Sequence, residues 1–285
     1  MKFTVLGSTG FIGSHVAALA RSQGHDIYCP SRRDSLAGRD LGHVIYAIGM
    51  TADFRQRPHE TIEAHVTKLQ EVLKQSSFES LVYLSSTRVY ARCAAGGHAD
   101  GLHSVNEKTA IPVVSSDFSD LYNLSKLMGE SIALSHGNGV RVARLSNVVG
   151  PDFASDNFLT SVLRDCIQKG RVVLRSSLAS VKDYVSVHDV AKILLKIGTE
   201  GRSPIYNVAS GCQTTNGAIV TELSRLTGAE ITVLPEAPTL GFPPIDISLL
   251  SSEFEFAPQC MEEILPDLVA QSWEYYSLPT RREAA

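Results

Sequence analysis

Three features are missing from this sequence: a large excess of one charge, a long apolar run and a paired cysteine motif. It contains 26 Lys and Arg residues against 30 Asp and Glu residues, a formal net charge of −4, so neither a nucleic-acid surface nor a polybasic membrane anchor is expected. The longest apolar runs, such as residues 44–48, fall far short of the roughly 20 residues that span a bilayer. The first expected strand runs straight into a glycine loop, which is not the layout of a signal peptide.

The cysteines are scattered and no two of them form a CxxC pair: they are Cys29, Cys93, Cys166, Cys212 and Cys260. This pattern predicts reduced thiols in a cytoplasmic protein and excludes a disulfide scaffold or a cysteine zinc site. His98 and His103 lack the paired spacing of metal ligands, so no metal is expected. Apolar residues make up 44% of the chain and charged residues 20%, which allows a buried core and excludes a disordered protein.

Short apolar runs alternate with longer helical patterns through the first half of the chain. We expect strands at 3–6, 26–29, 43–48, 81–84 and 141–145, with helices at 13–23, 61–75 and 120–136. Strands that are apolar almost throughout are typical of a parallel sheet covered on both faces. The alternation therefore predicts an α/β protein with a Rossmann-type, doubly wound parallel sheet. The short path from residue 31 to residue 43 leaves little room for the usual third strand.

The second half of the chain is less regular. Helical patterns at 156–169, 188–197, 217–226 and 261–276 are separated by short extended pieces. We expect a smaller lobe here that is partly interleaved with the sheet. The segment 93–119 is rich in Gly, His and Ser and has no periodicity, so we expect a loop.

A glycine loop connects the first expected strand to the first expected helix. Its residues are Gly7, Ser8, Thr9, Gly10, Phe11, Ile12 and Gly13, with GxxGxxG spacing. One glycine suits a tight turn, one lets the backbone approach a diphosphate and one allows the helix to pack closely on the strand. Free N–H groups at the start of the helix can then bind phosphate. The loop therefore predicts a dinucleotide-binding site.

The end of the second expected strand bears on which dinucleotide binds. An NAD site usually places an Asp or Glu there for the ribose hydroxyls, whereas arginine suits the 2′-phosphate of NADP. Here the strand is followed by Ser31, Arg32 and Arg33, and the first acid, Asp34, comes later. A hydroxyl and two guanidinium groups can hold a phosphate, so we expect NADP(H), with NAD(H) possible. The alternative is that both arginines are surface charges.

Tyr122 and Lys126 are four residues apart, so on a helix they share one face. This spacing alone occurs by chance on many helices. Ser86, however, ends an upstream buried strand, and the carboxyl ends of parallel strands are where open α/β sheets bind ligands. Lys126 and a nicotinamide cation would lower the pKa of Tyr122 from about 10, which would suit the phenol to acid/base chemistry.

With these motifs the chain resembles the extended short-chain dehydrogenase/reductase superfamily, and within it the NAD(P)-dependent sugar epimerase/dehydratase family. The resemblance covers nearly the whole chain. Beside the glycine loop it rests on residues 85–90 (SSTRVY, similar to SSxxVYG), 122–126 (YNLSK, similar to YxxSK), 144–151 (RLSNVVGP, similar to RxxNVxGP), 182–191 (KDYVSVHDVA, similar to RDYxxVxDVA) and 206–211 (YNVASG, similar to YNVxSG).

The resemblance implies a role for individual residues. Tyr122 would exchange a proton with a sugar hydroxyl or carbonyl, Lys126 would hold the nicotinamide ribose and Ser86 would hydrogen-bond the reacting oxygen. Further cofactor contacts are expected from Ala47, Ile48, Gly49, Leu84, Leu145 and Val148. The substrate is expected to contact Ser86, Thr87, Arg88, Asn147 and Lys182. Residues 1–150 would be the NAD(P)-binding domain and residues 151–285 mainly the substrate-binding lobe, and a homodimer is usual in the family.

Departures from the family pattern narrow the expected reaction. In the sugar 4,6-dehydratases of the family an Asp-Glu pair follows the catalytic Ser or Thr, whereas Thr87 and Arg88 follow Ser86 here, so dehydration is not expected. The family's arginine before Asp183 is Lys182 here, which keeps the charge but loses bidentate geometry. We therefore expect an oxidoreductase that transfers hydride from NADP(H) to a keto group of a nucleotide-activated (deoxy)sugar.

Three alternatives stay open. An NAD(P)-dependent nucleotide-sugar 4-epimerase would use the same tyrosine, lysine and serine. The substrate could also be a carbonyl compound that is not a sugar. Some relatives bind NADP as non-catalytic sensors or scaffold proteins, although these characteristically lose the tyrosine and lysine pair that is retained here.

Overall fold

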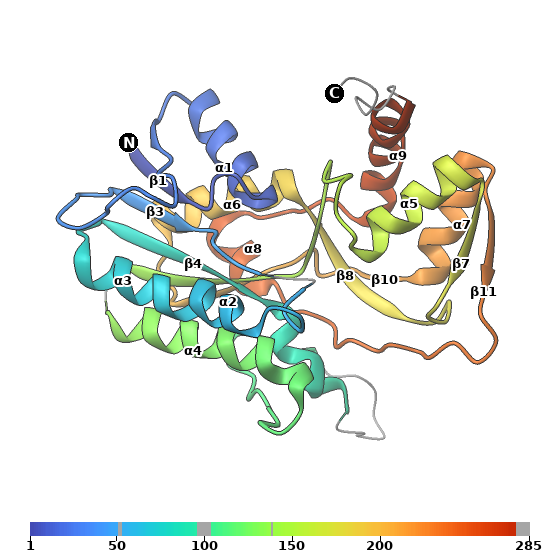
Figure 1. Ribbon diagram of the computed structural model, residues 1–285, viewed down its shortest axis with the longest axis horizontal. Coiled ribbons are helices and arrows are strands. Elements are labelled where there is room, and N and C mark those ends of the chain that lie inside the picture. The colour runs from blue at the N-terminus through green and yellow to red at the C-terminus, as the bar shows by residue number, and fades with distance from the viewer. Residues whose placement is uncertain (51–52, 96–103, 138, 278–285) are drawn as a thin grey trace.

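The computed structural model describes residues 1–50, 53–95, 104–137 and 139–277. A helix-covered parallel sheet lies at the left of Figure 1 and a smaller lobe of helices and short strands at the right. This arrangement confirms the expected fold class, an α/β protein with a Rossmann-type sheet and a smaller, interleaved C-terminal lobe. The division of the chain at residue 150 stays a prediction.

Six strands form the main sheet in the order β2-β1-β3-β4-β5-β9, and every neighbouring pair is parallel. They are β1 (Lys2–Leu6), β2 (Asp26–Tyr28), β3 (His43–Tyr46), β4 (Ser80–Ser86), β5 (Val140–Leu145) and β9 (Ile205–Val208). Within the described residues β2 is the last strand on its side, which agrees with the short path that follows it. Because all six strands run the same way, their carboxyl ends meet along one edge of the sheet.

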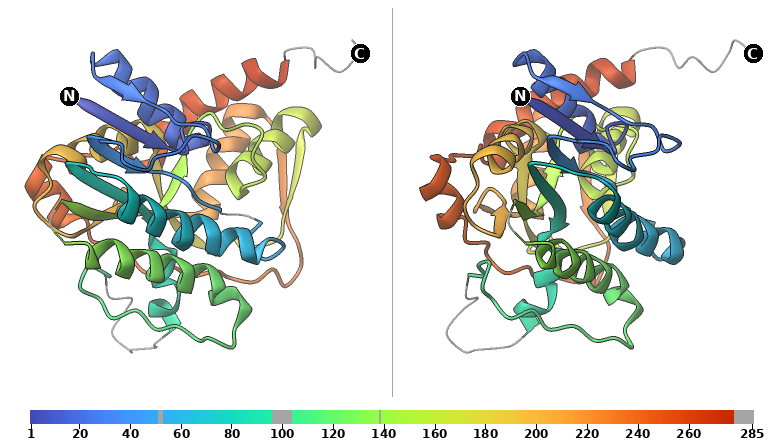
Figure 2. Two further views of the ribbon diagram at one scale, coloured as in Figure 1. Left: turned by 60° about the vertical axis from the view of Figure 1, so that its left-hand side comes forward. Right: turned by 90° about the vertical axis from the view of Figure 1, so that its left-hand side faces the viewer.

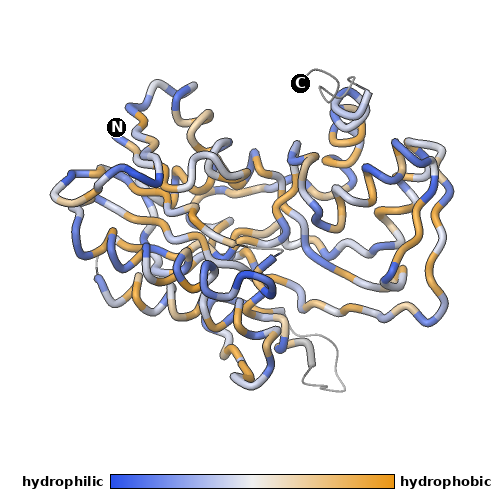
Figure 3. The backbone as a smooth tube through the Cα atoms, in the orientation of Figure 1, coloured by the Kyte–Doolittle hydropathy of each residue, from blue (hydrophilic) through white to orange (hydrophobic). Residues whose placement is uncertain are grey.

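Helices cover both faces of the main sheet (Figure 2). On one face, α1 (Phe11–Ser22) and α6 (Val187–Glu200) pack against each other, and α8 (Ser248–Phe254) joins the same apolar core. The opposite face is covered by α3 (Lys68–Gln75) and α4 (Leu121–Ser135). The apolar colour in Figure 3 follows the strands of the sheet between these two helix layers. This burial on both faces explains why the strands read as nearly continuous apolar runs.

The smaller lobe has its own apolar core. Its strands are β6 (Asn147–Val149), β8 (Val181–Ser186) and β10 (Gln213–Thr215) in one sheet, with β7 (Arg171–Leu174) and β11 (Glu230–Val233) as a separate parallel pair. The helices α5 (Phe158–Lys169), α7 (Asn216–Thr227) and α9 (Met261–Ser277) enclose the core. Because α6, β9 and α8 return to the main sheet between these elements, the two parts of the fold are interleaved.

Several local elements differ from expectation. The structure contains α8, which is not among the helices expected from the sequence. The helix expected over 61–75 begins with α2 (Pro58–Ile62) and passes through a π-helical turn at Glu63–Thr67 before α3. The loop expected over 93–119 begins within a 3₁₀ helix (Thr87–Ala95) and ends in a second one (Phe118–Asp120). His98 and His103 lie outside the described residues.

The structure brings Cys212 and Cys260 together, with their Cα atoms 6.4 Å apart, a contact that the sequence did not indicate. That the cysteines are reduced stays a prediction. The two cysteines are 48 residues apart, one beside β10 and the other just before α9. A pair with such a separation leaves no local spacing signal in the sequence. Cys29, Cys93 and Cys166 are free thiols.

No helix among the described residues is both long enough and apolar enough to cross a membrane. The described part of the chain also brings together no group of three or more His, Cys, Asp or Glu side chains that could hold a metal ion. That the protein works without a metal stays a prediction.

Candidate active site

The glycine loop lies where β1 passes into α1, and space alone requires two of its glycines. Gly7 has a φ of +86°, and a Cβ there would lie 2.8 Å from the carbonyl carbon of Ala47. A Cβ on Gly13 would lie 2.3 Å from the carbonyl oxygen of Gly7. Gly10 begins α1 without a side-chain cap, so the first N–H groups of the helix can still bind an anion. This cradle fits the diphosphate of a dinucleotide.

The other residues expected at the cofactor converge on the same edge of the sheet. Ser8 and Thr9 lie in the loop itself, and Phe11 and Ile12 form the first turn of α1. The remaining positions follow or end strands: Ala47, Ile48 and Gly49 after β3, Leu84 near the end of β4, Leu145 at the end of β5 and Val148 in β6. Residues that are far apart in the sequence thus lie at the carboxyl ends of the main-sheet strands, with Val148 in the sheet of the smaller lobe.

Ser31, Arg32 and Arg33 lie in an exposed turn after β2. The Ser31 backbone N–H donates to the Asp34 carboxylate at 2.7 Å, and the Arg33 N–H donates to Ser31 Oγ at 3.3 Å. The carboxylate of Asp34 is therefore held inside the turn, while both guanidinium groups are exposed to solvent.

Ser86 and Tyr122 meet where β4 ends and α4 begins. The Tyr122 side chain is buried, at 6% exposure. Burial raises the pKa of its phenol, whereas the hydrogen bond with Ser86 and the positive charge of Arg88 act to lower the pKa. The sequence pointed to Lys126 as the cation that acts on this phenol. In the structure the cation that lowers its pKa is Arg88.

Lys126 lies one turn after Tyr122 in α4. Its Nζ donates to the Leu84 carbonyl oxygen at 2.8 Å and lies 5.9 Å from the centre of the Tyr122 ring. Burial lowers the pKa of Lys126 to about 7, and the nearby Glu130 carboxylate acts to raise the pKa. The structure thus brings Ser86, Tyr122 and Lys126 together, with the lysine tied to the strand that carries the serine.

Arg88 faces Tyr122 from the 3₁₀ helix that follows β4. Its guanidinium carbon lies 5.4 Å from the centre of the Tyr122 ring and 5.0 Å from the centre of the buried Phe54 ring. Arg88 Nη2 donates to the Ser119 carbonyl oxygen at 3.5 Å. Burial lowers the pKa of Arg88, and the positive charge of Arg55 lowers it further. Arg88 is therefore part of the site and not a solvated surface residue.

His65 lies in the π-helical turn and packs edge-on against Tyr122, with ring centres 5.4 Å apart. Its Nε2 accepts from the Met50 N–H at 3.1 Å. In a neutral ring Nδ1 then carries the hydrogen, and Nδ1 lies 2.9 Å from Ser125 Oγ. The Ser125 hydroxyl donates in turn to the Tyr122 carbonyl oxygen at 2.8 Å. Burial lowers the pKa of His65 to about 2, and the charge of Lys126 adds to the effect. A neutral His65 thus links the loop after β3 to the start of α4.

The residues expected at the substrate differ in their exposure. Thr87 is only 3% exposed, which leaves little surface for a substrate. Asn147 is exposed, and its Nδ2 donates to the Asp183 carbonyl oxygen at 2.8 Å. Lys182 is half-buried with its Nζ 5.5 Å from the centre of the Phe158 ring. Burial lowers the pKa of Lys182, and the positive charge of Arg88 lowers it further.

A buried ion pair holds the elements behind the site. Arg144 Nη2 lies 2.6 Å from Glu130 Oε2, and each side chain is 5% exposed. Ser85 Oγ donates to Glu130 Oε1 at 2.5 Å, while Arg144 Nη1 donates to the Tyr90 hydroxyl at 2.6 Å. The Tyr90 hydroxyl donates in turn to Asn207 Oδ1 at 2.9 Å. This network ties α4 to β4, β5, β9 and the 3₁₀ helix of Arg88.

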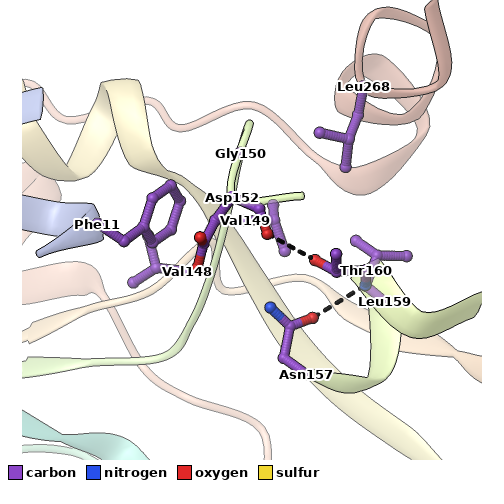
Figure 4. A pocket seen from close by; sticks show the side chains of 9 residues that line it. All are labelled: Phe11, Val148, Val149, Gly150, Asp152, Asn157, Leu159, Thr160 and Leu268. Carbon is purple, nitrogen blue, oxygen red and sulfur yellow. Dashed lines mark hydrogen bonds between the residues drawn. The ribbon is translucent and has the colours of Figure 1, made fainter. Parts of the chain in front are cut away.

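A small cavity lies between the first turn of α1 and the smaller lobe (Figure 4). Within it the Thr160 N–H donates to Asn157 Oδ1 at 3.0 Å, and the Thr160 hydroxyl donates to the Asp152 carbonyl oxygen at 3.5 Å. Its other lining residues are Phe11, Val148, Val149, Gly150, Leu159 and Leu268. The cavity lies at the junction of the two parts of the fold.

Comparison with known proteins decides the family. A sequence model described as the NAD dependent epimerase/dehydratase family matches residues 3–53 and 36–209. The chain belongs to this family. It is therefore an enzyme of the NAD dependent epimerase/dehydratase family, and an NAD(P) cofactor is typical of that family.

Three of the individual proteins that resemble this chain match it at 30% identity or less. A dTDP-glucose 4,6-dehydratase of Streptomyces griseus is 30% identical over 114 residues, which span 38% of this chain and 35% of that enzyme. The structure of MoeE5 in complex with UDP-glucose and NAD superimposes with a TM-score of 0.76 at 20% identity, covering 98% of this chain and 100% of MoeE5. RMD from Pseudomonas aeruginosa, complexed with NADPH, gives a TM-score of 0.75 at 20% identity, covering 96% of this chain and 100% of RMD. At such identities the two structures show a shared fold.

Three residues of the site were not singled out from the sequence: Phe54, Arg55 and His65. Phe54 packs on the Tyr122 ring with ring centres 5.5 Å apart, and the Arg55 guanidinium carbon lies 4.6 Å from the centre of the Phe54 ring. These residues belong to the connection after β3, which carries no motif. Its position beside the carboxyl end of a central strand is the only local signal for a role in the site.

Proposed function

We propose that this enzyme is an NADP(H)-dependent reductase that reduces the 4-keto group of a nucleotide-activated sugar, with Tyr122 as the proton donor. The observation that carries this proposal is the identity of the side chains around the Tyr122 phenol. They are the hydroxyl of Ser86, the ammonium of Lys126 and the guanidinium of Arg88. Reduction of a carbonyl needs one proton and one hydride, and no second acid or base.

Among the described residues no carboxylate is found to act on the Tyr122 phenol, and this favours reduction over dehydration. Loss of water from a sugar requires a base to remove a proton from carbon and an acid to protonate the leaving hydroxyl. Arg88 stays protonated in proteins and can serve as neither in the neutral range of pH. The nearest acid by sequence, Asp120, already accepts hydrogen bonds from Arg92 Nε at 2.5 Å and from the Val114 N–H at 2.8 Å. The site is therefore suited to a single proton transfer.

The residues of the chain have distinct tasks in this reaction. NADPH, when bound, supplies the hydride. Ser86 positions the carbonyl oxygen by a hydrogen bond, and Tyr122 gives its phenolic proton to that oxygen as it becomes a hydroxyl. Arg88 stabilises the phenolate that remains, because a nearby positive charge favours the ionised form of a phenol, and Lys126 holds the nicotinamide ribose. Burial of the phenol strengthens the electrostatic effect of Arg88, since little water screens it.

The turn after β2 supports a preference for NADP(H) over NAD(H). Its two exposed guanidinium groups, Arg32 and Arg33, stand at the strand end where the 2′-substituent of the adenosine ribose is read. The Asp34 carboxylate, which would repel a 2′-phosphate, is held by the Ser31 N–H. Among structures of similar fold the bound cofactor is NAD in MoeE5 and NADPH in RMD, so the fold accommodates both.

The proposed substrate class rests on the family and on the relatives. MoeE5 has been solved with UDP-glucose and also with UDP-glucuronic acid, and both ligands are nucleotide sugars. We further propose that the protein works in the cytoplasm as a homodimer. The support for a dimer is the resemblance to the family together with the exposed Met128 on α4, of which 56% is accessible.

The nucleotide content of the purified protein tests the reductase proposal against the epimerase alternative. A reductase must exchange its cofactor at each turnover, so we expect mass spectrometry to find little bound dinucleotide. Titration calorimetry should then show tighter binding of NADPH than of NADH, and Arg32→Ala with Arg33→Ala should remove the difference. A stoichiometric amount of tightly held oxidised cofactor would instead identify an epimerase, and an NADH preference would refute the assignment of the turn after β2.

A further inference from the structure

Two arginines converge beside the acid/base tyrosine, Arg88 from the 3₁₀ helix that follows β4 and Arg55 from the connection that follows β3. Arg88 Nη2 donates to the Ser119 carbonyl oxygen at 3.5 Å, and Arg55 Nη2 donates to the Ser119 hydroxyl at 3.4 Å. Both guanidinium groups also stack on the ring of Phe54, with carbon-to-centre distances of 5.0 Å for Arg88 and 4.6 Å for Arg55. Two like charges therefore lie around the same ring and the same serine.

Arg88 has donors left over. Its Nε is buried and has no hydrogen-bond partner among the described residues. The only hydrogen bond of its side chain to a described residue is the 3.5 Å contact with Ser119, although a guanidinium has five N–H donors. Asp120 attracts Arg88 electrostatically, but its carboxylate accepts hydrogen bonds from Arg92, Val114 and Asn123. Within the described residues no carboxylate forms an ion pair with either Arg88 or Arg55.

Such an arrangement costs free energy unless an anion joins it. A partly buried cation with an unpaired donor has lost hydration without gaining a partner, and a second cation nearby adds repulsion. Arg88 also lowers the pKa of a third cation, Lys182. An anionic group of the ligand would relieve all of these costs together, and the planar fork of a guanidinium matches a carboxylate or a phosphate.

We propose that Arg88 and Arg55 form a subsite for a carboxylate on the sugar ring, so that the preferred substrates are nucleotide-activated uronic acids and not neutral hexoses. This inference rests on the proposed function, because it takes the reacting carbon to lie at Tyr122. The position of Arg88 favours a carboxylate over the diphosphate. Its guanidinium carbon lies 5.4 Å from the centre of the Tyr122 ring, so an anion that it binds lies beside the reacting carbon. In a uronic acid the carboxylate is attached to the neighbouring ring carbon, whereas the diphosphate is attached across the ring.

Calorimetric titration of the NADP⁺-saturated protein with UDP-glucuronate, UDP-glucose and UDP tests the subsite, with dTDP-glucuronate, dTDP-glucose and dTDP as a parallel series. In whichever nucleotide series the protein binds, we expect the uronate to bind at least about tenfold more tightly than the hexose. This ratio corresponds to a difference of about 1.4 kcal/mol in binding free energy. Arg88→Gln and Arg55→Gln should each weaken binding of the uronate more than binding of the hexose, and so reduce this ratio towards one. Arg55 is an exposed residue, so its variant is informative even if Arg88→Gln unfolds the protein.

Arg225→Gln is the matched control, because Arg225 is exposed on α7 and, within the described part of the chain, its ion pair is with Glu222 alone. It should leave the uronate-to-hexose ratio as it is in the wild type. Equal binding of uronate and hexose by the wild type would overturn the inference and leave the proposed function intact. Equal weakening of uronate, hexose and free nucleotide by Arg88→Gln would assign the arginines to the diphosphate and overturn it too. Failure of the wild type to bind any nucleotide sugar would overturn both proposals.

Discussion

The guanidinium of Arg88 and the ring of Tyr122 face each other, with 5.4 Å between the guanidinium carbon and the ring centre. This places a permanent positive charge beside the side chain that is proposed to give up a proton. It opposes the effect of burial, which raises the pKa of the phenol. The arginine at this position also takes the place of a carboxylate that dehydration would need. Arg88 thus affects the pKa of Tyr122, and in the proposals above it also bears on the type of reaction and on the charge of the preferred substrate.

Tyr122→Phe should lower turnover by about 100-fold or more, the usual contribution of a general acid or base. Dissociation constants for NADPH should change little, because the ring and its packing on Phe54 and His65 are kept. Steady-state kinetics and calorimetry measure the two effects separately. The matched control is Tyr275→Phe on the exposed side of α9, which should be as active as the wild type. Turnover that survives in Tyr122→Phe would contradict the assignment of the proton donor.

Gly13→Ala should abolish dinucleotide binding, because the new Cβ would lie 2.3 Å from the Gly7 carbonyl oxygen and would displace the loop from α1. Gly241→Ala is the control, since nothing lies within 4 Å of the corresponding Cβ position. Fluorescence titration with NADPH compares the two variants. Binding by Gly13→Ala with the affinity of the wild type would show that the loop does not hold the dinucleotide.

Lys126 gives a prediction for the pH dependence of stability. In the folded protein without ligand, burial lowers the pKa of Lys126 from 10.5 to about 7, so between these pH values the unfolded chain binds a proton that the folded chain does not. The free energy of unfolding therefore rises with pH in this window. Lys126→Met removes the group. Urea denaturation should show the wild type gaining stability relative to Lys126→Met from pH 7 to about 10, by at most about 1.4 kcal/mol per pH unit. A constant or falling difference would mean that Lys126 stays charged.

Glu130→Gln should destabilise the fold by about 3 kcal/mol, because it leaves Arg144 buried without its partner charge. The exposed pair of Arg225 and Glu222 supplies the control, and Glu222→Gln should leave the unfolding midpoint nearly unchanged. Thermal and urea unfolding measure both variants. A Glu130→Gln protein as stable as the wild type would show that the buried network is not what holds α4 against β4 and β5.

The sheet could be predicted from the sequence because its signals are local. The apolar runs of β3 and β4 and the glycines at 7, 10 and 13 each fix a strand or a turn within a few residues. The Tyr122 and Lys126 pair could likewise be placed on one face of a helix from its spacing alone.

The features that could not be predicted depend on contacts across the fold. His65 contacts Tyr122 from a π-helical turn between α2 and α3, and no local sequence pattern predicts that turn. Arg55 and Arg88 are 33 positions apart in the sequence and meet at Ser119. The contact between Cys212 and Cys260 similarly arises from the way that α9 returns to the smaller lobe. Tertiary packing, and not propensity, determines these contacts.

Transfer of deuterium from labelled NADPH tests the proposed reaction most directly. The protein is incubated with a nucleotide-activated 4-keto sugar and NADPH that carries deuterium at the transferable position of the nicotinamide, and the product sugar is analysed by mass spectrometry and NMR. We predict stoichiometric oxidation of NADPH and one deuterium on carbon 4 of the product. Interconversion of 4-epimers without net NADPH oxidation, or a product sugar without the label, would contradict the account.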